Sequence, residues 1–298
     1  MNDSVTATPQ FDRTAEDLGN IVELGHVNVT VPDQTKATAF YIMGLGLTRD
    51  PYLMAGIENM WVNVGRGQFH LPTRATPQVV RGTTALVVPD LEAAMKRLHG
   101  VQKYLEGTAF GFQQAGDVIE TTCPWGNRIR LHAPDTARFG PMRVGMPYVE
   151  FDIPPGTDLG AIAKFYTDIM GAIAGVESDA RGPYAWARTS AESRVIYRES
   201  SRTQPDYDGH HIQITLVDFS GPHRRLLERG LISEESDQHQ YRFLDIVDID
   251  SNKPLFRIEH ETRSMRHPMF NRVFVNRNPD MNNRNFVPGY EVGLWALS

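Results

Sequence analysis

The sequence predicts an α+β protein made of four β-α-β-β-β units, because two kinds of strand-helix segment each occur twice. The segment HVNVTVPDQTKATAFYIMGLGL (residues 26–47) returns as YVEFDIPPGTDLGAIAKFYTDIMGA (residues 148–172). The segment TTALVVPDLEAAMKRLHG (residues 83–100) is matched in the same way by HIQITLVDFSGPHRRLLERGL (residues 211–231). Repeats of this length indicate the architecture more directly than any single residue does.

Each unit begins with an alternating strand, turns at a corner containing Pro or Asp, and continues as an amphipathic helix that ends near Gly. Short strand-like runs separated by Gly, Asn or Asp follow each helix, as in residues 60–72, 118–134, 194–200 and 241–261. We therefore expect two domains, each a curved, cup-shaped mixed sheet with helices outside. The expected divisions are a flexible arm (1–20), an N-terminal domain (21–140), a C-terminal domain (141–276) and a tail (277–298).

Composition excludes several classes of partner. The 298 residues carry a formal net charge of −6, with acids and bases interspersed, so neither nucleic acid nor a membrane is an expected partner. Cys123 is the only cysteine and cannot form an internal disulfide, which is typical of a reducing compartment. The N-terminal segment lacks a secretory signal and no run is long enough to cross a bilayer, so we expect a cytoplasmic protein.

Strand alternation predicts which side chains meet on a polar face. In HVNVTVP the valines pack on the helix, while His26 lies on the opposite face. The same count places Glu150, His211 and Glu259 on polar faces of the second half. One imidazole and two carboxylates are a competent ligand set for a divalent metal, provided that the two facing units bring them together. His26 and His70, as single strand histidines, are expected to be hydrogen-bonded interior residues.

The repeated units, the helix ends FYIMGLGL and FYTDIMGA, and the runs CPWGNRIRL and FRIEHE resemble the vicinal oxygen chelate superfamily. This superfamily includes glyoxalase I, bleomycin-resistance proteins, fosfomycin-modifying enzymes and type I extradiol ring-cleaving dioxygenases. The resemblance covers most of the chain, from Ile21 to Arg263. Four units in one chain is the layout of the extradiol dioxygenases, whose second domain holds Fe(II) through two His and one Glu.

The resemblance implies metal ligands at His211, Glu259 and the position of Tyr148. Because Tyr is a poor Fe(II) ligand, we expect Glu150, one pleat further along, to serve instead, with Tyr148 as the alternative position. Glu150 also fits a simple ion pair with an arginine such as Arg257.

The family pattern further implies catalytic roles for His239, Tyr241 and Tyr197, and Arg257 and His267 are expected to contact substrate. In the first domain the corresponding positions are His26, Thr83 and Arg130, and a cation at the carboxylate position predicts a structural, metal-free domain.

The function expected from the resemblance is a metal-dependent, extradiol-type dioxygenase that uses Fe(II) and O2 on a catechol-like aromatic. Two alternatives remain open. A glyoxalase-like lyase or isomerase would use Mn, Zn, Ni or Co in the same ligand set, and a metal-free resistance-type protein would bind a small molecule without any cofactor. A homo-oligomer is a further expectation from the superfamily.

Overall fold

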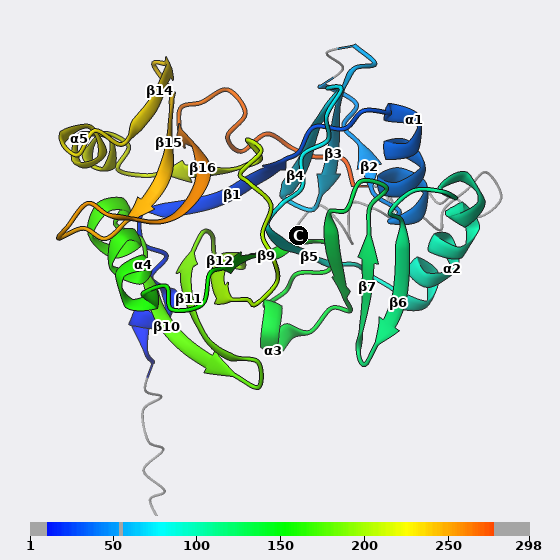
Figure 1. Ribbon diagram of the computed structural model, residues 1–298, viewed down its shortest axis with the longest axis horizontal. Helices are drawn as coiled ribbons and strands as arrows, with labels where there is room; N and C mark the ends of the chain where they lie inside the picture. Colours follow the sequence, from blue (N-terminus) through cyan, green and yellow to red (C-terminus); the bar gives the residue numbers. More distant parts are fainter. Residues whose placement is uncertain (1–10, 54–55, 277–298) are drawn as a thin grey trace, which may run out of the picture.

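The computed structural model describes residues 11–53 and 56–276, so the expected tail and the first ten residues of the expected arm lie outside the described residues. Two eight-stranded mixed sheets dominate the structure, with short helices around them (Figure 1). This confirms the predicted α+β class. No described helix combines the length and the apolar character needed to cross a bilayer.

All four predicted units are present. The first comprises β1 (Ile21–Asn28), α1 (Gln34–Ala37), the π-helical η2 (Thr38–Gly44), β2 (Thr48–Arg49), β3 (Asn59–Val64) and β4 (Gly67–Pro72). The second comprises β5 (Gly82–Val87), α2 (Leu91–Val101), η3 (Gln102–Tyr104), β6 (Gly111–Ala115), β7 (Val118–Thr122) and β8 (Arg128–His132). The third comprises β9 (Gly145–Ile153), α4 (Leu159–Phe165), η4 (Tyr166–Met170), β10 (Ala174–Asp179), β11 (Gly182–Arg188) and β12 (Arg194–Glu199). The fourth comprises β13 (His211–Leu216), α5 (Ser220–Glu228), β14 (Ile232–Asp237), β15 (Gln240–Val247) and β16 (Pro254–Ser264). Two short helices lie outside the units, η1 (Arg13–Glu16) and α3 (Thr136–Phe139).

Aspartates fix where four of the helices begin. The side chains of Asp33, Asp90, Asp135 and Asp158 accept hydrogen bonds from backbone N–H groups in the first turns of α1, α2, α3 and α4. A carboxylate at this position satisfies donors that have no partner within the helix. The acidic corners of the sequence repeats, at Asp33, Asp90 and Asp158, are therefore the physical starts of α1, α2 and α4.

The units pair differently from the expectation. The first sheet has the strand order β14-β15-β16-β13-β1-β4-β3-β2 and so combines the first and fourth units. The second sheet, β10-β11-β12-β9-β5-β8-β7-β6, combines the second and third. Helices of consecutive units pack together instead, since α2 lies against η2 and α5 against η4. Each half of the chain thus contributes four strands to each sheet. The polar face of each sheet is therefore built from side chains of both halves.

Alternation within the strands is as expected. Val27 and Val29 belong to the main apolar core, whereas His26 points to the opposite face of the first sheet, where its ring meets that of His211 at a centroid distance of 5.6 Å. We call this opposite surface of each sheet its polar face.

Candidate metal centre on the first sheet

Three metal-ligating side chains converge on the polar face of the first sheet. One ligand atom from each of His26, His211 and Glu261 lies within 4.8 Å of the others, and all three residues are buried. The Nε2 atoms of His26 and His211 lie 4.0 and 3.4 Å from the same carboxylate atom, Oε2 of Glu261. The arrangement supplies two imidazoles and one carboxylate from three adjacent strands.

Strand register explains this convergence. β1 and β13 are antiparallel and pair Asn28 with His211 and His26 with Gln213, while the parallel strand β16 pairs Gln213 with Glu261. Side chains on neighbouring strands at such positions share a face and lie close enough to touch. The site therefore exists only because the first and fourth units share a sheet.

Two arginines hold the carboxylate in place. Nη2 of Arg242 lies 2.7 Å from Oε2 of Glu261, and Nη2 of Arg263 lies 2.7 Å from Oε1. Burial alone would raise the pKa of Glu261, but its interactions with His26, His211 and Arg263 lower the pKa below its ordinary value. Glu261 is consequently a carboxylate, the form that binds metal ions.

The imidazole of His26 is kept neutral. Burial lowers the pKa of His26 well below its ordinary value, against the opposing charge of Glu261. Beside it, His70 stacks on Trp61 at 3.8 Å with an interplanar angle of 11°, and Nε2 of His70 bonds Oδ1 of Asn59 at 2.7 Å. His26 meets both rings edge-on, so these residues form an aromatic wall next to the candidate ligands.

The donor set fits a divalent metal. Among the described residues, the Nε2 atoms of His26 and His211 are buried and lack a hydrogen-bond partner. Metal bonds to nitrogen and oxygen are about 2.0–2.2 Å long, so donors on one ion stand about 3 Å apart, and small side-chain movements would close the observed gaps. The arginine contacts of Glu261 are compatible with this, because ligating carboxylates commonly accept further hydrogen bonds that orient them.

Comparison with known proteins supports the fold. No protein-family model and no curated protein matches the chain. Glyoxalase I from Zea mays matches with 12% identity and a TM-score of 0.56, covering 83% of this chain and 93% of that one. A protein from Bacillus subtilis, provisionally described as a dioxygenase, matches with 12% identity and a TM-score of 0.51, covering 84% and 87% of the two chains. The chain has the vicinal oxygen chelate fold.

Within this vicinal oxygen chelate fold, only part of the expected ligand set comes together. His211 lies in the cluster, and its Nδ1 is 3.3 Å from Oε1 of Glu259. That same oxygen lies 2.5 Å from Nη1 of Arg242, whose Nη2 binds Glu261. The neighbouring carboxylate on the same face, Glu261, takes the position between the two histidines.

Glu150 is not brought to this site. It lies on β9 of the second sheet, where Arg181 binds both of its oxygens at 2.7 Å and Arg198 lies 3.5 Å away. The expectation that Glu150 joins His211 is corrected by the sheet pairing, which separates the third unit from the fourth. Glu150 thus forms an ion pair with an arginine, which is the alternative given for it in the sequence analysis. Its partner is Arg181 and not Arg257.

The expected proton-transfer residues are distributed over the core and a turn. Tyr197 bonds Tyr166 at 2.6 Å, and Tyr241 packs on Phe219 and His223, so both phenols face the helix side of their sheets. Tyr148, the alternative ligand position, bonds Nε2 of His132 at 2.9 Å on the second sheet. His239 lies in the turn between β14 and β15. The structure does not bring these side chains to the cluster.

The segment after β16, residues 265–276, crosses the polar face of the first sheet, and we call it the strap. Nδ2 of Asn63 bonds the backbone oxygen of Val275, Asn276 bonds Gly65 in both directions, and Arg272 binds Asp50. His267 lies near the start of the strap, and burial, followed by the charge of Arg263, lowers its pKa to about 4. Arg257, the other expected substrate contact, is exposed and binds Asp245 at 2.8 Å.

Sequence reasoning missed His26 and Glu261 as candidate ligands. From the sequence, His26 falls in an expected metal-free domain, because its unit is expected to pair with the second unit, where Arg130 stands at the carboxylate position. One signal was present, since histidine occurs on the first strand of the first and fourth units alone, at His26 and His211.

Proposed function

We propose that the chain is a metal-dependent enzyme of the vicinal oxygen chelate type, with His26, His211 and Glu261 as ligands and an extradiol-type ring cleavage as its reaction. The observation that carries this proposal is the convergence on one carboxylate oxygen of two imidazole nitrogens that have no hydrogen-bond partner within the described part of the chain. Two histidines and one carboxylate with open positions are the ligand set of non-haem Fe(II) oxygenases.

The surrounding residues prepare the site for an oxygen-rich substrate. A bound divalent cation would offer open positions to two adjacent substrate oxygens, and its positive charge would favour their ionised form. Arg242 and Arg263 fix both oxygens of Glu261, and burial keeps His26 in the neutral form that ligates. The stacked pair of Trp61 and His70 offers a flat wall of the shape that a planar aromatic substrate would contact.

Metal analysis tests the ligand assignment. Protein purified without chelator is expected to hold about one divalent ion per chain, and His26→Ala, His211→Ala and Glu261→Gln are each expected to weaken metal affinity by more than about tenfold. Glu150→Gln is the matched control, because it removes a buried carboxylate of the second sheet. Unchanged metal content in all three ligand variants, or its loss in the control, would contradict the assignment.

A second observation favours an alternative reaction. Glu259 places another carboxylate 3.3 Å from His211, and a glyoxalase-like isomerase or lyase needs a base beside its metal. Oxygen uptake separates the two proposals. With iron restored, a dioxygenase consumes O2 when given a catechol, whereas an isomerase or lyase works equally well under nitrogen and with Mn, Zn, Ni or Co. Wild-type protein free of metal even after incubation with these ions would favour the metal-free binding protein.

A further inference from the structure

The second sheet carries Arg130 at the position where the first sheet carries the candidate metal ligand Glu261. The central strands β9 and β5 pair Tyr148 with Ala85 and Glu150 with Thr83, as β1 and β13 pair His26 with Gln213 and Asn28 with His211. The next strand, β8, pairs Arg130 with Ala85, as β16 pairs Glu261 with Gln213. Matching registers therefore places Tyr148, Thr83 and Arg130 at the positions of His26, His211 and Glu261.

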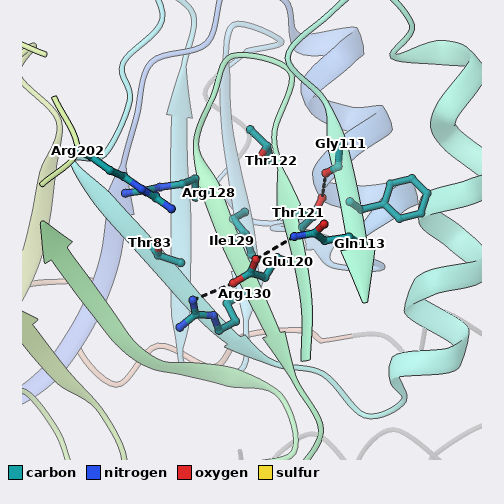
Figure 2. A pocket seen from close by; sticks show the side chains of 11 residues that line it. Thr83, Gly111, Gln113, Glu120, Thr121, Thr122, Arg128, Ile129, Arg130 and Arg202 are labelled. Atoms are coloured by element: carbon teal, nitrogen blue, oxygen red, sulfur yellow. Dashed lines mark hydrogen bonds and ion pairs between the residues drawn. The ribbon is translucent and has the colours of Figure 1, made fainter. Parts of the chain in front are cut away.

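A cavity of about 250 Å³ opens on this part of the second sheet. Thr83, Arg128 and Arg130 line it from β5 and β8, Glu120 lines it from β7, and Arg202 reaches it from the loop after β12 (Figure 2). In Figure 2, Arg128 and Arg202 lie together at one end, and Arg130 extends towards Glu120. The charged lining residues are thus three arginines and one glutamate, a net charge of +2.

These arginines keep part of their hydrogen-bonding capacity free. Arg128 donates from Nε to the backbone oxygen of Gly82 at 2.9 Å and from Nη2 to Asp152 at 2.5 Å, while Arg130 donates from Nη2 to Glu120 at 3.0 Å. Within the described residues, Arg202 takes part in hydrogen bonds through its backbone alone. A guanidinium has five N–H donors, so each of the three retains donors for a ligand.

We propose that this cavity binds a small oxyanion, a carboxylate or a phosphate group, without a metal ion. Guanidinium groups bind both kinds of anion through charge-assisted and often bidentate hydrogen bonds. Arg128 and Arg130 are held in position by their carboxylate partners, Thr83 adds a hydroxyl donor, and Arg202, which has no ion pair within residues 11–53 and 56–276, supplies a further positive charge. The two sheets would then bind ligands by opposite means, the first through a cation and the second through fixed positive side chains.

Calorimetric titration of the full chain, with EDTA present and ionic strength held constant by NaCl, tests this proposal. Inorganic phosphate and malonate are the two probes. We expect saturable binding of at least one probe, which Arg202→Gln weakens by roughly fivefold or more. Arg130→Gln is expected to weaken it as well, and its thermal unfolding in the absence of probe shows whether it has folded.

Two controls locate the site. Arg224 is exposed on α5, which packs beside the edge strand β14 of the first sheet, and Arg224→Gln removes the same charge without touching the cavity. His211→Ala changes the candidate metal centre. Affinity within about twofold of wild type in both controls supports the assignment, and binding of one probe alone identifies a phosphate-bearing or a carboxylate-bearing ligand. Absence of saturable binding by wild type, equal weakening by Arg224→Gln, unchanged affinity in Arg202→Gln, or loss of binding in His211→Ala would overturn it.

Discussion

At the scale of single residues, the same side-chain type has opposite roles on the two sheets. Glu261 is held by two arginines and still faces two imidazoles, whereas Glu150 is enclosed by Arg181 and Arg198 with no imidazole in contact among the described residues. The chemical role of each glutamate therefore depends on the strand that lies beside it.

Glu150→Gln is expected to destabilise the fold without affecting metal content. The side chain of Arg198 is 8% exposed, so neutralising its partner leaves a buried charge only partly compensated, at a cost of about 2 kcal/mol. Urea denaturation measures this loss. Glu177→Gln removes a half-exposed partner of Arg194 and is the matched control, with an expected loss of about 0.5 kcal/mol. Equal stability of the two variants would contradict the buried ion pair.

His132 is expected to make the fold sensitive to mild acid. Burial, followed by the charges of Arg138 and Arg130, lowers its pKa from 6.5 to about 4. Between these values the unfolded chain binds a proton that the folded chain does not, so stability falls as pH decreases from about 6.5 to 4, by up to about 3 kcal/mol. Comparing urea denaturation of wild type and His132→Gln at pH 8 and pH 5 checks this. Substitution is expected to flatten the pH dependence, and parallel curves for the two proteins would contradict the assignment.

At the scale of elements, the sequence predicts the units well and their pairing poorly. Alternation in HVNVTVP and the acidic corners at Asp33, Asp90 and Asp158 depend on local geometry, and the structure contains those strands and helix starts. Which first strands share a sheet depends on contacts between residues about two hundred positions apart, as for Asn28 and His211. The candidate ligands follow from that pairing, so His211 could be found from the sequence and its partners could not.

The strap is an element whose middle part is held by one buried carboxylate. Asp50 is fully buried, and besides Arg272 it accepts hydrogen bonds from the backbone N–H groups of Tyr52 and Leu53. Arg272→Gln removes the cation and is expected to speed amide hydrogen exchange across residues 265–276 by roughly tenfold, as the strap opens more often. Arg266→Gln, an exposed change in the same segment, is the matched control. Similar exchange in both variants would show that the ion pair does not hold the strap.

At the scale of the whole molecule, the two halves of the chain depend on each other in both sheets. The N-terminal half contributes β1 and β5, and the C-terminal half contributes their partners β13 and β9. Separating the halves would expose four strand edges that are paired in the intact protein, and such edges associate readily. It would also divide the candidate metal centre, leaving His26 on one fragment and His211 with Glu261 on the other.

Expressing residues 1–140 and 141–298 as separate fragments tests this dependence. Each fragment alone is expected to self-associate and to lack tight metal binding, because it exposes two first strands and holds an incomplete ligand set. Mixing them is expected to give a one-to-one complex by size-exclusion chromatography, with metal content restored, since the β1–β13 and β5–β9 ladders can form again. Complementation by an N-terminal fragment carrying His26→Ala should restore the complex but not the metal. Two stable monomeric fragments that do not bind each other would contradict the pairing of the sheets. A complete metal site in the C-terminal fragment alone would contradict the role given to His26.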